Sequence, residues 1–151
     1  MTSPAPAVPA WTLPAGTRLL FFHKQRTSAR LRFLLFAEGL VVPASLAADA
    51  LLSSPPEAAG TVVVHPAVLA AASERFFDLA RGEVQIDHEF RIRGQERGEL
   101  FTLLLAEFTT IDPPFDAAAA VGGRFVAITE ARGLGSSERE VLRLAYAHVL
   151  G

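Results

Sequence analysis

The sequence predicts an α+β fold: a two-layer sandwich in which a mixed, mainly antiparallel sheet of five or six strands carries helices packed on one face. Three observations lead to this prediction. Polar and apolar residues alternate from Glu83 to Ile92, as on a strand with one face in the core. An apolar stripe of helical spacing follows His65, and a helix-start pattern stands at Ser137. Because the other face of the central strand is charged, helices are expected on one side only.

Composition sets the limits of the prediction. The chain has 151 residues, half of them hydrophobic, which suits one domain with a substantial core. Four prolines before residue 16 predict a flexible tail over residues 1–16, followed by a single α+β domain over 17–151. There is no cysteine, which excludes disulfides, thiol nucleophiles and thiolate metal sites. The sequence shows neither a secretory leader nor a membrane-length apolar run, so we expect a cytoplasmic protein that does not enter a membrane. The abundance of arginine and alanine suggests a bacterial source.

The first half of the chain is expected to alternate short strands and helices. Residues 17–23 are rich in β-formers and predict a first strand. Residues 30–42 predict a second strand, because Leu31, Phe33 and Leu35 alternate with arginines. A helix capped by Ser28 is the alternative for this segment. Further along, we expect a short helix over 45–53, a buried strand over 61–64, and a helix that begins after His65 and ends at a left-handed glycine, Gly82.

The second half begins with the alternating strand at 83–92. A hairpin with residues 99–110 is preferred, and a helix over 96–108 is the alternative. One helical turn over 116–121 and a strand over 124–130 follow. The last helix is expected to open with a capping box, in which the Ser137 hydroxyl accepts a backbone amide and Glu140 reaches back.

A basic segment is the strongest lead to a partner. All sixteen aspartate and glutamate residues lie after residue 37, so every charged side chain in the first 37 residues is a lysine or an arginine. Four of these cations cluster together: Lys24, Arg26, Arg30 and Arg32. Aromatic residues flank them (Phe21, Phe22 and Phe33). Arginines that hold phosphates beside aromatic rings that stack on bases are typical of nucleic-acid binding. The alternative is that these rings belong to the core and the cations are merely solvated.

Two strand–helix junctions are candidates for binding an anion. His65 stands where a strand feeds a helix, and the turn before the last helix holds Gly133, Gly135, Ser136 and Ser137. Free backbone amides at a helix start attract phosphates. The structural alternative explains the same residues as turn glycines and a serine cap. No complete dinucleotide-binding or phosphate-loop motif is present.

The remaining polar residues do not form a recognisable catalytic or metal-binding motif. The four histidines lack the spacing of metal ligands, and His88 and His148 are interpreted as core histidines. Glu83, Asp87 and Glu89 share one strand face, which Arg91 and Arg93 partly neutralise. We therefore expect no cofactor and no metal. The first hypothesis is a non-catalytic, homodimeric interaction or regulatory module; the alternatives are a nucleic-acid-binding protein using residues 24–32, and a small-molecule or phosphate binder or enzyme at a strand–helix junction.

Overall fold

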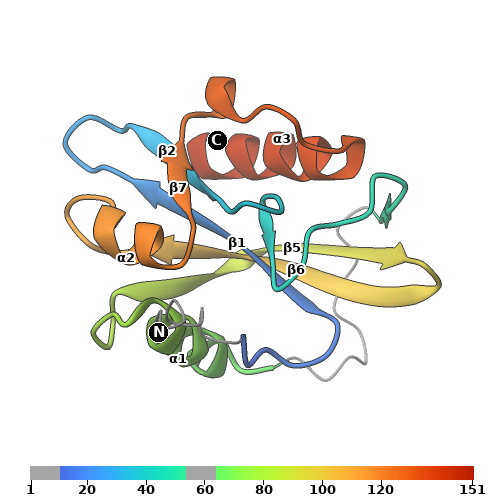
Figure 1. The fold of residues 1–151 in the computed structure, drawn as a ribbon, viewed down its shortest axis with the longest axis horizontal. Helices are drawn as coiled ribbons and strands as arrows, with labels where there is room; N and C mark the ends of the chain where they lie inside the picture. Colours follow the sequence, from blue (N-terminus) through green and yellow to red (C-terminus); the bar gives the residue numbers. More distant parts are fainter. Residues whose placement is uncertain (1–10, 54–63) are drawn as a thin grey trace, which may run out of the picture.

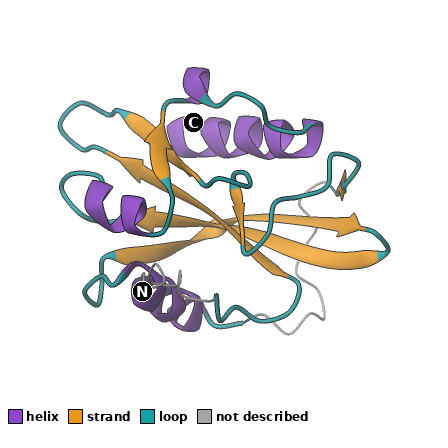
Figure 2. Cartoon of the chain, viewed as in Figure 1, coloured by secondary structure: helices purple, strands orange, loops and turns teal. Residues whose placement is uncertain are grey.

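A computed structural model describes residues 11–53 and 64–151. It confirms the α+β class and the mixed, mainly antiparallel sheet (Figures 1 and 2). The elements are, in chain order, β1 (Thr17–Lys24), β2 (Leu31–Leu35), β3 (Val41–Val42), β4 (Leu51–Leu52), α1 (Pro66–Phe77), β5 (Val84–Glu96), β6 (Glu99–Phe108), α2 (Phe115–Ala120), β7 (Arg124–Val126), the 3-10 helix η1 (Ile128–Glu130) and α3 (Ser136–Leu150).

The sheet has the strand order β4-β5-β6-β1-β2-β7, and β3 pairs with β1. Among the described strand pairs, only β1 and β6 run parallel. The structure confirms the hairpin of 83–92 with 99–110, and it has no helix over 30–42. The single strand predicted there is two separate strands, β2 and β3, with a turn between them. The long β5–β6 hairpin extends beyond the rest of the sheet (Figure 1).

Helices pack on both sides of the sheet, where the sequence indicated one side. Figure 1 shows α3 above the strands and α1 below them. Apolar residues of α3, such as Val141 and Ala145, pack with Leu103 and one set of strand residues. Leu69 of α1 and Ala118 of α2 pack with the opposite set. β1 and much of β6 are buried on both faces, so each face of the sheet is covered by its own helices.

A register shift between β5 and β6 explains why helices cover both faces of the sheet and not one. The register against β6 shifts between Ile86 and Arg91: five residue steps along β5 correspond to two along β6, from Ala106 to Leu104. Such a bulge reverses which face the following residues point to. Ile86 therefore packs in the cluster of α1, whereas Ile92 packs in the cluster of α3. The predicted single apolar face of 83–92 is correct only within each half of the strand.

Local predictions failed where a distant contact decides the backbone. The predicted helix over 45–53 is wrong: this segment is irregular and ends in the edge strand β4. The left-handed residue that ends α1 is Asp78 (φ 56°), not Gly82. The predicted capping box is also wrong, because the Ser137 hydroxyl donates to the carbonyl of Ala47 and Glu140 pairs with Arg143. The predicted strand over 124–130 ends at Val126. Most of the strand predicted over 61–64 lies outside the described residues.

Trp11 packs against the body of the protein. Its ring lies 3.8 Å from that of Phe76, centroid to centroid, and it also contacts Phe21 and Phe77. Residues 1–10 of the predicted tail lie outside the described residues. Trp11 therefore holds the start of the described chain against the face of the sheet that α1 covers.

The end of β5 is tied to the segment before β4 by Glu96. Its carboxylate accepts hydrogen bonds from the amide of Ala47 and, at 2.9 Å, from the guanidinium of Arg18, which also donates to the carbonyl of Ala44. The Ala47 amide, reinforced by Arg18, holds the pKa of Glu96 below its ordinary value despite partial burial.

We expect Glu96→Gln to reduce the free energy of unfolding at pH 7 by about 1 to 2 kcal/mol, since it weakens charge-assisted hydrogen bonds. A carboxyl whose pKa is lowered by folding stabilises the protein above its unfolded-state pKa, and this contribution disappears as the pH falls through the folded-state pKa. Urea unfolding between pH 7 and pH 3 should therefore show the variant and the wild-type protein converging at acid pH. A difference that stays constant with pH would contradict this role of Glu96.

Candidate functional site

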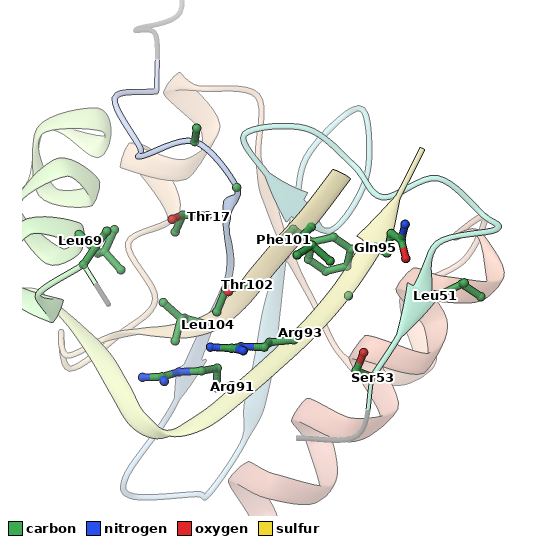
Figure 3. A pocket seen from close by; sticks show the side chains of 15 residues that line it. Thr17, Leu51, Ser53, Leu69, Arg91, Arg93, Gln95, Phe101, Thr102 and Leu104 are labelled. Atoms are coloured by element: carbon green, nitrogen blue, oxygen red, sulfur yellow. The ribbon is translucent and has the colours of Figure 1, made fainter. Parts of the chain in front are cut away.

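A groove of about 670 Å³ lies on the α1 side of the sheet (Figure 3). Its size is typical of small-molecule sites. β5 and β6 form its floor, and the start of β1, β4 and the beginning of α1 form its sides. We call it the β5 groove. Its described lining comprises Ala15, Gly16, Thr17, Leu51, Ser53, Val64, Leu69, Arg91, Arg93, Gly94, Gln95, Leu100, Phe101, Thr102 and Leu104.

Side chains of neighbouring strands form three rows across the groove. Residues opposite one another in the strand register point to the same face of a sheet. From the hairpin tip inward, the rows are Leu51–Gln95–Leu100, Arg93–Thr102–Thr17 and Arg91–Leu104–Leu19. The outer row is mainly apolar and exposed, and the middle row is polar. The two leucines of the inner row belong to the apolar cluster between the sheet and α1.

Two arginines give the groove its electrostatic character. Arg91 and Arg93 are half-buried and project from β5 in the same direction (Figure 3). No aspartate or glutamate is among the described residues that line the groove. Arg93 already has an interaction partner of its own. Guanidinium groups at a partly apolar surface favour an anionic ligand, because they present several donors and are weakly hydrated.

The irregularity in β5 places these arginines in the groove. On an uninterrupted strand, Arg91 would share a face with Gln85, which points away from the α1 cluster. After the register shift, Arg91 lies opposite Leu104, a member of that cluster. The same local feature that divides the apolar residues between two cores thus brings two cations onto the α1 face.

The predicted anion-binding residues do not meet in one site. His65 is the N-cap of α1, and its Nδ1 accepts from the amide of Ala67 at 3.1 Å. The ring is exposed, although the neighbouring Val64 lines the β5 groove. At the other predicted junction, a Cβ on Gly135 would meet Ala48 at 3.3 Å, so the turn is packed against the segment before β4.

The serine hydroxyls of that turn already donate hydrogen bonds to backbone carbonyls. Ser136 donates to the carbonyl of Ala48 at 2.8 Å, and Ser137 donates to that of Ala47. Gly133 lies at a smaller hollow of about 270 Å³, beside Arg124 and Arg132. Gly135, Ser136 and Ser137 therefore pack the start of α3 against the loop before β4, and for these three residues the geometry favours the structural interpretation over a phosphate cradle.

The predicted nucleic-acid residues lie at one end of the β1–β2 hairpin. Arg26 and Arg30 are exposed on the β1–β2 turn. Lys24 donates to the carbonyl of Val149 at 3.4 Å, and the guanidinium of Arg32 lies 5.9 Å from the ring centroid of Phe115. The aromatic residues that were candidates for base stacking are buried, at 4% exposure or less: Phe21, Phe22 and Phe33. They are core residues, and the nucleic-acid contact stays a prediction resting on the cations.

Polar residues also gather at the carboxyl-terminal end of α3. His148 lies 2.9 Å from a carboxylate oxygen of Asp87, in the irregular part of β5. Glu107 is half-buried between two small hollows, and burial raises the pKa of its carboxyl. His88 is exposed and His23 is fully buried, with Nε2 2.8 Å from the carbonyl of Thr110. The interpretation of His88 as a core histidine is wrong, because the irregularity turns it outward.

No group of three or more histidine, aspartate or glutamate side chains within residues 11–53 and 64–151 is arranged to hold a metal ion. No helix in the same part of the chain is long and apolar enough to cross a membrane.

Comparison with known proteins finds similarity to solved structures. No protein-family model matches the chain, and no curated protein matches it. A matching solved structure is the crystal structure of the Ap4A hydrolase of C. elegans, with 13% sequence identity and a TM-score of 0.46. The match covers 88% of this chain and 97% of the hydrolase chain.

This match corrects the first functional hypothesis. The protein of similar structure is an enzyme, which goes against the prediction of a non-catalytic interaction module, and we do not retain that prediction. Homodimer formation, the bacterial source and the cytoplasmic location stay predictions.

Sequence reasoning missed the β5 groove. Arg91 and Arg93 were interpreted as neutralising the acids of an exposed strand face. The sequence did contain one signal: Arg91 and Arg93 are two residues apart and therefore share one face of their strand. Thr102 and Leu104 share one face of the next strand in the same way. The register that joins these pairs is set by the irregularity in β5 and was not visible.

Proposed function

We propose that this protein binds a small organic anion in the β5 groove. The observation that carries the proposal is the half-buried Arg91 on the floor of a groove whose described lining, Arg93 apart, is apolar or uncharged. A guanidinium in such a setting gains more from an anion than it does in open solvent, because the surrounding dielectric is lower. The hydroxyl groups of Thr17 and Thr102 supply further hydrogen bonds.

Arg93 strengthens the positive potential, but it already has an interaction partner. Arg91 is therefore the guanidinium on which the proposal depends. The start of α1 adds to the same field, since Val64 and Leu69 line the groove and the amino-terminal end of a helix carries a partial positive charge. The apolar side chains of the groove would bury the uncharged part of the ligand.

The test uses 8-anilinonaphthalene-1-sulfonate, an aromatic anion whose fluorescence rises in an apolar site. We expect saturable binding that weakens about tenfold to hundredfold in Arg91→Gln, the range of a lost charge-assisted hydrogen bond. Arg139→Gln is the matched control, because Arg139 is an exposed cation on α3 outside the groove. Equal dye affinity in Arg91→Gln and in the wild-type protein would rule the proposal out.

A further inference from the structure

The outer row of the β5 groove is unusually apolar for an exposed surface. Leu51 is 68% exposed and Leu100 is 78% exposed, on either side of Gln95. Both leucines line the groove, as does Phe101. A pair of exposed leucines at the mouth of a site indicates apolar surface that a ligand covers.

The distance between the cation and this apolar row defines the shape of the ligand. Arg91 and Gln95 are four residues apart on β5, which corresponds to about 13 Å along a strand. The middle row, with Thr17 and Thr102, lies between them. A ligand that uses both ends of the groove therefore carries its charge at one end and an extended apolar part at the other.

We propose that the ligand class is an aliphatic carboxylate of medium chain length. This inference rests on the proposed function of the groove. The carboxylate pairs with Arg91, where a planar guanidinium offers two parallel donors to the two carboxylate oxygens. The chain runs along β5 across the middle row and ends between Leu51 and Leu100 of the outer row.

A monoanion fits the charges better than a phosphate ester does. Arg93 is already engaged by another group, which leaves Arg91 as the guanidinium available for the ligand. The described lining offers no further cation, and its outer row has only the amide of Gln95 as a polar group. The apolar row would add little to a compact, highly hydrated phosphate, whereas it can bury the methylenes of a chain.

The experiment measures displacement of the bound dye by straight-chain carboxylates from butyrate to decanoate, each below its micelle concentration. We expect affinity to rise about fourfold for each methylene buried. Leu100→Gln should weaken decanoate about tenfold and butyrate little, because only the longer chain reaches the outer row. Ile111→Gln is the matched control: Ile111 is 88% exposed and lies outside the groove.

Several outcomes would overturn this inference. Affinity independent of chain length, or phenyl phosphate displacing the dye more strongly than decanoate, would reject the aliphatic carboxylate while the Arg91-dependent dye binding still supports an anion site. Sedimentation with phosphatidylglycerol vesicles that is lost in Leu100→Gln, without decanoate binding, would replace the free ligand by a lipid surface. Dye binding that does not depend on Arg91 would remove the proposed function itself.

Discussion

Glu138→Ala is expected to lower the free energy of unfolding by about 3 to 5 kcal/mol, the largest polar contribution that we identify. Glu138 is 2% exposed, and its carboxylate accepts three backbone hydrogen bonds, from Leu40 at 3.0 Å, Leu46 at 3.1 Å and Val41 at 3.3 Å. Each buried donor that loses its partner costs about 1 to 3 kcal/mol, and partial access of water reduces the sum.

Glu138→Ala should also destabilise the loop over residues 39–46 locally, in addition to lowering the stability of the whole fold. Residues 39–46 contain no long helix or strand, and Glu138 supplies the acceptors that a regular element would otherwise provide. A side chain at Gly39 would clash with the same carboxylate, since its Cβ would lie 2.6 Å from Oε1. Amide hydrogen exchange should therefore show loss of protection at Leu40 and Leu46 in the variant before the sheet is affected.

Two variants separate the role of the acceptor from that of the side-chain volume. Glu138→Gln keeps the shape and one acceptor oxygen, and we expect it to be less destabilising than alanine. Glu140→Ala removes an exposed glutamate of the same helix, which pairs only with Arg143, and should leave urea unfolding unchanged within error. Equal unfolding midpoints of Glu138→Ala and the wild-type protein would show that the loop amides find other acceptors.

Glu138 also illustrates what the sequence could not reveal. The pattern around Ser137 correctly predicted a helix start, but the partners of its side chains lie about ninety residues away in the chain. Local rules assign such residues to a cap, because they consider only the helix itself. The same limit produced the wrong helix at 45–53, a segment whose conformation depends on Glu96 and on the start of α3.

The elements with strong internal periodicity were predicted well. β1, the β5–β6 hairpin, α1 and α3 are long and carry their apolar pattern within one segment. The division of helices between the two faces was not predicted, because it depends on a register shift between β5 and β6. The β5 groove follows from that same shift, so the missed site and the missed layer have a common physical origin.

The second large effect is expected for Phe21→Ala, which should destabilise the protein by about 3 to 5 kcal/mol. Phe21 has no exposed surface, and its ring centroid lies 5.1 Å from that of Phe77 and 5.3 Å from that of Phe108. It joins β1, β6 and α1 in one aromatic cluster, to which Trp11 also belongs. Removing the ring leaves a cavity among side chains from three elements, which cannot close without moving the sheet.

This substitution also decides between the two interpretations of the aromatic residues beside the basic segment. A ring that stacks on bases can be removed with little loss of stability, whereas a core ring cannot. Unfolding in urea should be followed by Trp11 fluorescence, since this single tryptophan reports on the cluster directly, and by far-UV circular dichroism for the whole fold. Phe115→Ala, at a ring that is 53% exposed, serves as the control and should change the midpoint little. A Phe21→Ala protein as stable as this control would mean that the aromatic cluster is not part of the core.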